Sequence, residues 1–144
     1  MRTVVIGIGN ALRGDDGAGI AVAERLHGVA CDEEPSRLIE AWEGADAAIL
    51  VDTVVSGAPP GTLHRFDASE EPIPAHELRS STHAIGVAET IELARALGRL
   101  PKRVVVYGIE GARFDPGDPL SPEVEAAVRR VVATIEEEIC TSAR

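Results

Sequence analysis

The chain has 144 residues and a formal net charge of −10, and these two values already exclude several classes of protein. The length fits one domain (1–144), large enough to bury about two-thirds of its unfolded surface without disulfides or metals. The acidic charge repels nucleic acids and anionic membranes and favours a basic peptide or protein partner, although it also serves solubility. Aromatic residues, at 3%, are too few for a base-stacking surface.

The first half of the chain alternates between strand and helix patterns. In order, we expect a strand at residues 3–6, a helix at 15–26, a strand at 29–31, a helix at 36–42 and a strand at 47–55. The acidic residues Asp15 and Asp16 suit a helix N-terminus, and Ser36 is the expected cap of the second helix. The run at 47–55 is almost continuously apolar, which is typical of a central parallel strand.

The second half continues this alternation. We expect a strand at residues 62–66, a helix at 83–98, a strand at 103–109 and a helix at 121–139. The Ser-Ser-Thr segment at 80–82 offers a cap for the first of these helices, whose apolar residues fall on one face. Ser121 before Pro122 has the pattern of an N-cap followed by proline at the first helical position. The order of elements predicts an α/β fold, a three-layer α/β/α sandwich with a mostly parallel central sheet.

The termini and cysteines give no sign of export or membrane insertion. Arg2 and the β-branched run after it are typical of a strand and not of a signal peptide. No apolar run approaches the roughly 18 residues that span a membrane, so we expect a cytoplasmic protein with no membrane partner. Cys31 and Cys140 are too few for a disulfide framework or a zinc motif, and we expect two ordinary buried or half-buried thiols.

Three side chains are candidates for a site at the carboxyl ends of the strands, where ligands bind in open α/β sheets. They are Asp16 after the first strand, Asp52 within an apolar strand, and His83 at the start of an amphipathic helix. An unpaired buried carboxylate costs several kcal/mol, so Asp52 has to be paired, protonated, metal-bound or at the strand's exit. Two carboxylates and one imidazole suit a divalent transition metal.

Each candidate also has an ordinary structural interpretation. Asp16 fits a first-turn acid, Asp52 fits a strand-end acid that caps a turn, and a lone histidine at a helix start is usually on the surface. The three residues are too far apart in the sequence to form a compact metal motif. His27, His64 and His76 have no comparable placement and are expected on the surface.

Motifs of several other enzyme classes are missing. Leu12 stands where the third glycine of a dinucleotide-binding Gly-x-Gly-x-x-Gly motif would be, so we expect no cofactor-binding residues of that kind. The same substitution argues against an unrelated nucleotide-binding domain. The sequence also has no P-loop, no His-Glu-x-x-His zinc protease motif and no Gly-x-Ser-x-Gly nucleophile elbow.

Four segments, in order and covering nearly the whole chain, resemble the signatures of the [NiFe] hydrogenase maturation protease family. They are Gly-Ile-Gly-Asn at 7–10 with Arg-Gly-Asp-Asp-Gly-Ala-Gly at 13–19, Val-Asp at 51–52 with Gly-Ala-Pro-Pro-Gly-Thr at 57–62, Ser-Thr-His-Ala-Ile-Gly at 81–86, and Gly-Ile-Glu at 108–110 with Leu-Ser-Pro-Glu-Val at 120–124. The resemblance implies that the chain has a phosphorylase/hydrolase-like fold and is a monomer. It also implies that the chain acts as a hydrogenase maturation endopeptidase.

The resemblance also implies a substrate and a role for each candidate residue. The family's metal-binding trio corresponds to Asp16, Asp52 and His83, which would recognise nickel already inserted in the [NiFe] hydrogenase large-subunit precursor. The nickel would be the substrate's own, and cadmium or zinc can substitute for it in a crystal. Cleavage then removes the precursor's C-terminal extension, and Asp16 is the expected catalytic residue that assists the attacking water.

One segment departs from the family's pattern. After its second strand the family usually has an acid, two glycines and a threonine, in a loop associated with substrate recognition. Here residues 32–37, Asp-Glu-Glu-Pro-Ser-Arg, contain no glycine. The departure leaves an alternative open, in which the chain is a non-cleaving, metal-sensing or chaperone-like binding protein of the same fold.

Overall fold

The structure, a computed structural model, describes residues 1–32, 34–74 and 86–142. At its centre lies a five-stranded sheet in the order β2-β1-β3-β5-β4. In chain order the strands are β1 (Thr3–Ile8), β2 (Val29–Cys31), β3 (Ala47–Val54), β4 (Leu63–Asp67) and β5 (Arg103–Glu110). The first three and β5 run parallel, while the edge strand β4 is antiparallel to β5. The predicted, mostly parallel sheet is therefore confirmed.

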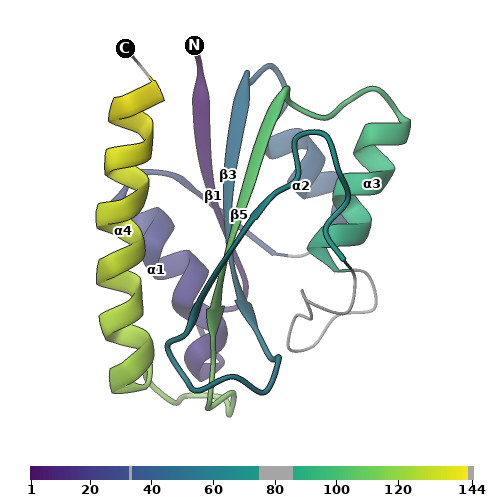
Figure 1. The fold of residues 1–144 in the computed structure, drawn as a ribbon. Coiled ribbons are helices and arrows are strands. Elements are labelled where there is room, and N and C mark those ends of the chain that lie inside the picture. Colours follow the sequence, from purple (N-terminus) through teal and green to yellow (C-terminus); the bar gives the residue numbers. More distant parts are fainter. Residues whose placement is uncertain (33, 75–85, 143–144) are drawn as a thin grey trace.

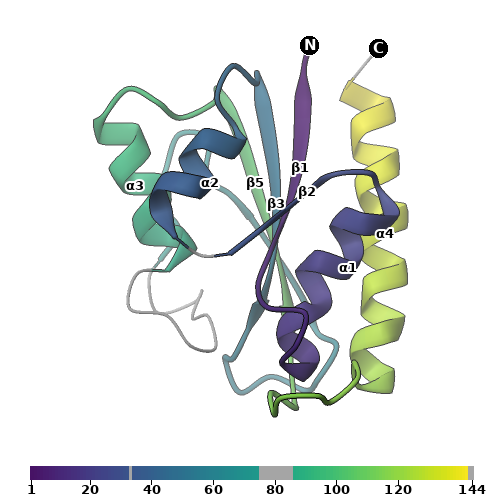
Figure 2. The same cartoon turned by 180° about the vertical axis from the view of Figure 1, so that it is seen from behind.

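Helices cover both faces of this sheet. They are the 3-10 helix η1 (Gly14–Gly17) and the α-helices α1 (Ala18–Arg25), α2 (Pro35–Ala41), α3 (Val87–Ala96) and α4 (Pro122–Ser142). Helices α1 and α4 pack on one face and α2 and α3 on the other, as Figure 1 and Figure 2 show from opposite sides. This is the predicted three-layer arrangement. Within the described segments, no helix has the length and apolar character that crossing a membrane requires.

The central strand β3 explains the continuous apolar run in the sequence. Successive side chains of a strand point to opposite faces of the sheet. Accordingly, Ala48 and Leu50 pack in the core under α2 and α3, while Ile49 and Val51 pack in the core under α1 and α4. Because helices cover both faces, every residue of β3 is buried.

Helix α1 approaches the sheet closely because glycines lie on both sides of the contact, Gly19 in α1 and Gly7 in β1. A Cβ atom on Gly19 would lie 2.3 Å from the carbonyl oxygen of Val51 and 2.7 Å from that of Ile8. A Cβ atom on Gly7 would lie 2.0 Å from the carbonyl oxygen of Gly19. No side chain fits at these distances, so these glycines allow the start of α1 to pack directly on β1 and β3.

Helix α2 begins one residue earlier than predicted, and its cap is different. The sequence pattern predicts Ser36 as the cap, but the helix begins at Pro35, and the Glu34 carboxylate accepts a hydrogen bond from the Arg37 N–H at 3.3 Å. Proline suits the first helical position because its missing N–H would have no partner there. Glu34 thus caps α2 within the segment that departs from the family's glycine pattern.

Helix α3 begins later than the sequence pattern predicts. It starts at Val87, after Gly86 in an extended conformation, whereas the apolar pattern predicts a helix over 83–98. The Gly86 backbone is thus not helical and marks the start of the element. The expected cap at 80–82 and His83 lie outside the described residues.

Candidate functional site

The loops that follow β1, β3 and β5 gather at one end of the sheet, the lower end in Figure 1. In open α/β sheets this carboxyl end is where ligands bind. Asp16, in η1, follows β1, and Asp52 lies near the end of β3. Their exposed fractions are 1% and 0%. The structure therefore brings both predicted carboxylates to the same end of the sheet, as expected from the parallel strand order.

Asp16 is fixed by the loop that the first signature forms. The Asn10 N–H donates to the Asp16 carbonyl oxygen at 3.2 Å and to its Oδ2 at 3.1 Å, and the Asp16 N–H donates to the Arg13 carbonyl at 3.1 Å. Gly9 has a φ of +144°, and a Cβ there would lie 2.0 Å from the Asp16 carbonyl oxygen. Glycine at this position is what allows the end of β1 to pass beside Asp16.

Asp52 is held within the ladder of β3 and β5, where it pairs with Gly108. Its Oδ1 accepts a hydrogen bond from the Thr53 N–H at 2.8 Å. The Thr53 hydroxyl donates to the Asp15 carbonyl oxygen at 2.7 Å. The residues next to Asp16 and Asp52 in the chain are therefore joined directly, and η1 packs on the end of β3.

Asp15 has a role that the sequence did not reveal. Its carboxylate is fully buried and accepts four hydrogen bonds, from the N–H groups of Ala112 (2.8 Å), Arg113 (2.9 Å) and Ser121 (2.7 Å) and from the Ser121 hydroxyl (2.7 Å). Burial raises the pKa of the Asp15 carboxyl, but the four hydrogen bonds together lower it by more than burial raises it. The pKa of Asp15 therefore lies below the ordinary value.

The position of Asp15 also corrects the predicted role of this acid. The sequence suggests that it favours the N-terminus of the helix that follows it, α1, but its carboxylate lies at the N-terminus of α4, where Ser121 precedes Pro122. The helix dipole of α4 adds to the stabilisation of the negative charge there. The partners of Asp15 are about a hundred residues away, so no local sequence signal indicates them.

A further buried carboxylate, Glu110, lies at the end of β5. It accepts hydrogen bonds from the Ser56 N–H (2.8 Å) and hydroxyl (2.6 Å), and His64 Nε2 lies 3.2 Å from its Oε1. His64 is therefore half-buried, and its predicted surface position is wrong, because β4 places it beside this acid. His27 is exposed as predicted, and His76 lies outside the described residues.

The two cysteines are free thiols, which agrees with the prediction that they form no disulfide. Cys31 is half-buried at the end of β2, where burial and the neighbouring Asp32 raise its pKa. Cys140 is exposed on α4, contrary to the expectation of two buried or half-buried residues, because it lies on the face of α4 turned away from the sheet.

His83, the third predicted metal ligand, lies outside the described residues. Among the residues that are described, no group of three His, Cys, Asp or Glu side chains could hold a metal ion. Helix α3 runs antiparallel to β5 in Figure 1, so the N-terminal end of this helix points toward the carboxyl end of the sheet. The donor types at this end, the carboxylates of Asp16 and Asp52, are compatible with a divalent metal that has one further nitrogen ligand.

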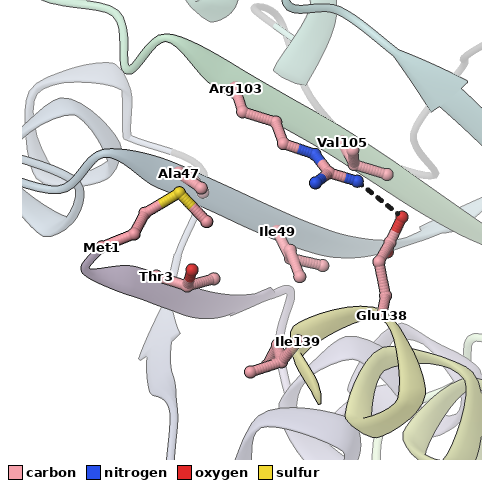
Figure 3. A pocket seen from close by; sticks show the side chains of 9 residues that line it. Met1, Thr3, Ala47, Ile49, Arg103, Val105, Glu138 and Ile139 are labelled. Atoms are coloured by element: carbon pink, nitrogen blue, oxygen red, sulfur yellow. Dashed lines mark hydrogen bonds and ion pairs between the residues drawn. The ribbon is translucent and has the colours of Figure 1, made fainter. Parts of the chain in front are cut away.

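Figure 3 shows a pocket at the opposite end of the sheet, beside Met1 and the Arg103–Glu138 ion pair (3.3 Å). Its volume is about 10 Å³, which is room for a single water molecule. It lies near Ala47, five residues before Asp52, or roughly 16 Å along β3. This pocket is too small for a peptide and distinct from the carboxyl end.

Comparison with known proteins identifies the chain's relatives. The family model for HycI, hydrogenase maturation protease, matches residues 33–138. The hydrogenase expression/formation protein HupD of Bradyrhizobium diazoefficiens is 33% identical over 134 residues, covering 85% of this chain and 70% of that protein. HupD of Thiocapsa roseopersicina is 31% identical over 144 residues, covering 92% of this chain and 64% of that protein, so the chain spans less than two-thirds of its length.

The fold leads to the same group of proteins. The [NiFe] hydrogenase maturation protease HybD from Thermococcus kodakarensis superposes with a TM-score of 0.76 at 27% identity, covering 95% of this chain and 98% of that one. The family model covers more than half of the chain, and the Bradyrhizobium protein exceeds 30% identity over most of both sequences. This chain therefore belongs to the hydrogenase maturation protease family.

Proposed function

We propose that this chain is the endopeptidase that removes the C-terminal extension from the nickel-loaded large-subunit precursor of a [NiFe] hydrogenase. Its membership of the protease family supports the reaction class. The observation that carries the proposal is the pair of buried carboxylates, Asp16 in η1 and Asp52 near the end of β3, two elements joined by the Thr53–Asp15 hydrogen bond of 2.7 Å. Such a pair is suited to recognising a cation that the substrate brings with it.

In this proposal Asp16, Asp52 and His83 together bind the nickel carried by the precursor. Nickel accepts mixed oxygen and nitrogen ligands, which this set of side chains supplies. Asp16 and Asp52 are held by backbone N–H groups before any substrate arrives, so little ordering is needed on binding. The metal is part of the substrate, and the enzyme reads its presence as the signal that the precursor is ready for cleavage.

Asp16 is the residue to which we assign the proton transfer. Its carboxylate would accept a proton from a water molecule as the water attacks the scissile carbonyl carbon, and would return the proton to the leaving amine. Bond cleavage then releases the extension with a new N-terminus. Asp52 and His83 would keep the precursor's metal, and thus the scissile bond, within reach of Asp16.

Cleavage of a precursor tests this proposal. A large-subunit precursor is prepared with and without nickel, incubated with the enzyme, and followed by intact mass. We expect loss of a C-terminal peptide only from the nickel-loaded form, and no cleavage by Asp16→Asn. Asp115→Asn is the matched control, because Asp115 is an exposed acid on the loop after β5. It should cleave like wild type.

The alternative of a non-cleaving binding protein predicts a different outcome. The chain would then bind the nickel-loaded precursor, and would do so in an Asp52-dependent way, yet leave its mass unchanged. The glycine-free segment at 32–37 is the feature that favours this alternative.

We further propose that the chain acts as a monomer in the cytoplasm. Size-exclusion chromatography tests the oligomeric state, and cell fractionation tests the localisation.

A further inference from the structure

Asp15 is a junction between three parts of the carboxyl end. Its N–H donates to the Arg113 carbonyl at 2.7 Å, and its carboxylate binds the loop after β5 and the start of α4 through Ala112, Arg113 and Ser121. Its carbonyl oxygen accepts the Thr53 hydroxyl of β3 at 2.7 Å. One residue thus connects the loop after β1 with the end of β3 and with the loop after β5.

The connected residues are the chain neighbours of the two candidate metal ligands. Asp15 precedes Asp16 in η1, and Thr53 follows Asp52 in β3. Both Asp15 and Thr53 are fully buried, so water does not compete for their hydrogen bond. A change in the length of that bond moves the backbone of one carboxylate relative to the other.

We infer that Asp15, Thr53 and Ser121 form a clamp that sets the separation between the Asp16 and Asp52 carboxylates, and that they are positioning residues for nickel recognition and cleavage. The inference rests on the proposed function, because it assigns the clamp to the same site. None of the three needs to touch the substrate. They act by holding η1 and the end of β3 in one relative position.

The demand on geometry explains why a clamp is needed. Metal–ligand distances have to be correct within about 0.2 Å, and residues that orient metal ligands typically change metal affinity or activity by roughly 10-fold to 100-fold when they are replaced. Asp52 lies in β3 but Asp16 lies in η1, outside the sheet, so the sheet alone does not fix their separation. The clamp ties η1 to β3 at the positions next to the carboxylates.

Thr53→Val removes the hydroxyl with little change in side-chain size. The Asp15 carbonyl oxygen keeps a second donor, the Ala18 N–H, so the variant leaves no buried acceptor without a hydrogen bond. The fold is therefore expected to survive. Thr53→Ser keeps the hydroxyl and serves as the rescue variant. Tyr107→Phe also removes a hydroxyl from a buried residue of the same sheet, one that binds Glu138 on α4, and is the matched control.

The test measures two quantities for each variant. The first is the affinity for cadmium ion alone, by isothermal titration calorimetry, and the second is kcat and KM for the nickel-loaded precursor. We expect Thr53→Val to weaken cadmium binding about 10-fold or more and to lower kcat by a similar factor. Thr53→Ser should restore both values to near those of wild type, and Tyr107→Phe should change neither.

The outcomes separate this inference from the proposed function. If wild type binds cadmium but cleaves no precursor, the proposed function fails, while the cadmium affinity of Thr53→Val still decides the inference. Equal affinity and kcat in Thr53→Val and wild type would overturn the clamp, as would a loss that Thr53→Ser does not restore. If Thr53→Val does not fold, Ser121→Ala, which loosens the other side of the clamp, replaces it with the same expected direction.

Discussion

The two ends of the sheet hold their carboxylates in different ways. At the amino end, Glu138 of α4 is bound by the guanidinium groups of Arg65 and Arg103 and by the Tyr107 hydroxyl at 2.7 Å. At the carboxyl end, Asp15 is bound by backbone N–H groups and the Ser121 hydroxyl. The carboxylate at the amino end is therefore stabilised mainly by positively charged side chains, and Asp15 at the carboxyl end is stabilised by neutral hydrogen-bond donors.

The difference has a consequence for ligand binding. A guanidinium group cancels the charge of the carboxylate that it binds, whereas N–H and hydroxyl donors stabilise the charge without cancelling it. The Asp15 carboxylate thus adds negative potential beside Asp16 and Asp52, where a metal cation is proposed to bind. The amino end, in which Arg65 and Arg103 surround Glu138, does not attract a cation in the same way.

The largest effect is expected from Asp15→Ala. The substitution leaves the buried N–H and hydroxyl groups of Ser121 without their acceptor and also removes the bonds to the Ala112 and Arg113 N–H groups, which should lower the free energy of unfolding by about 3 kcal/mol or more. Urea denaturation measures this loss. Asp115→Ala, an exposed acid on the same loop, should stay within about 0.5 kcal/mol of wild type. Equal stability of the two variants would contradict the proposed importance of Asp15.

Glu110→Ala should have a smaller effect at the same end of the sheet. Glu110 is as buried as Asp15, but one of its partners, Ser56, is exposed and the other, His64, is half-buried. Water can therefore reach their freed groups, and we expect a loss of about 2 kcal/mol in urea denaturation. A loss greater than that of Asp15→Ala would show that Asp15 is not the main anchor of this end.

At the amino end, Glu138→Gln should cost about 1 kcal/mol at pH 7, because Arg65 and Arg103 are partly exposed and water screens the pairs. Burial raises the Glu138 pKa, but hydrogen bonds from Arg65 and Tyr107 and the charges of Arg65 and Arg103 lower it below its ordinary 4.5. The stabilisation is therefore complete above about pH 4.5 and is lost as the pH falls through the lowered folded-state pKa. Thermal unfolding of wild type and Glu138→Gln across this range should show their difference shrink on acidification. A difference that grows at low pH would contradict this sign.

The smallest effect is expected on the outer surface. Arg25 of α1 and Glu125 of α4 form an ion pair of 2.6 Å, with side chains that are 40% and 36% exposed. Arg25→Gln should lower stability by about 0.5 kcal/mol or less, and added salt should remove the difference. If the loss were larger than that of Glu138→Gln, solvent screening would not explain the ranking of the ion pairs.

Local patterns in the sequence were sufficient to predict most of the fold. The apolar run at 47–55 predicts a strand covered on both faces, and β3 matches it to within one residue. The Ser121-Pro122 pair predicts the start of α4, which begins at Pro122. These features depend on side-chain periodicity and backbone preference over a few residues, which a single sequence displays directly.

The site could be predicted only in part. The interruption of an apolar strand indicated Asp52, and the loop after the first strand indicated Asp16. The partners of Asp15 and the pairing of His64 with Glu110 depend on contacts between residues far apart in the chain, so no local pattern contains them. The start of α3 was missed because apolar periodicity does not register an extended glycine such as Gly86.

Anomalous diffraction from crystals soaked in cadmium would show whether Asp16, Asp52 and His83 form a metal site, because it locates the metal without assuming any activity. We expect an anomalous peak at the carboxyl end of the sheet, within bonding distance of the Asp16 and Asp52 carboxylates and of His83, and its loss in Asp52→Asn crystals. Cadmium bound only elsewhere, for example at the amino end of the sheet, would contradict the proposed site.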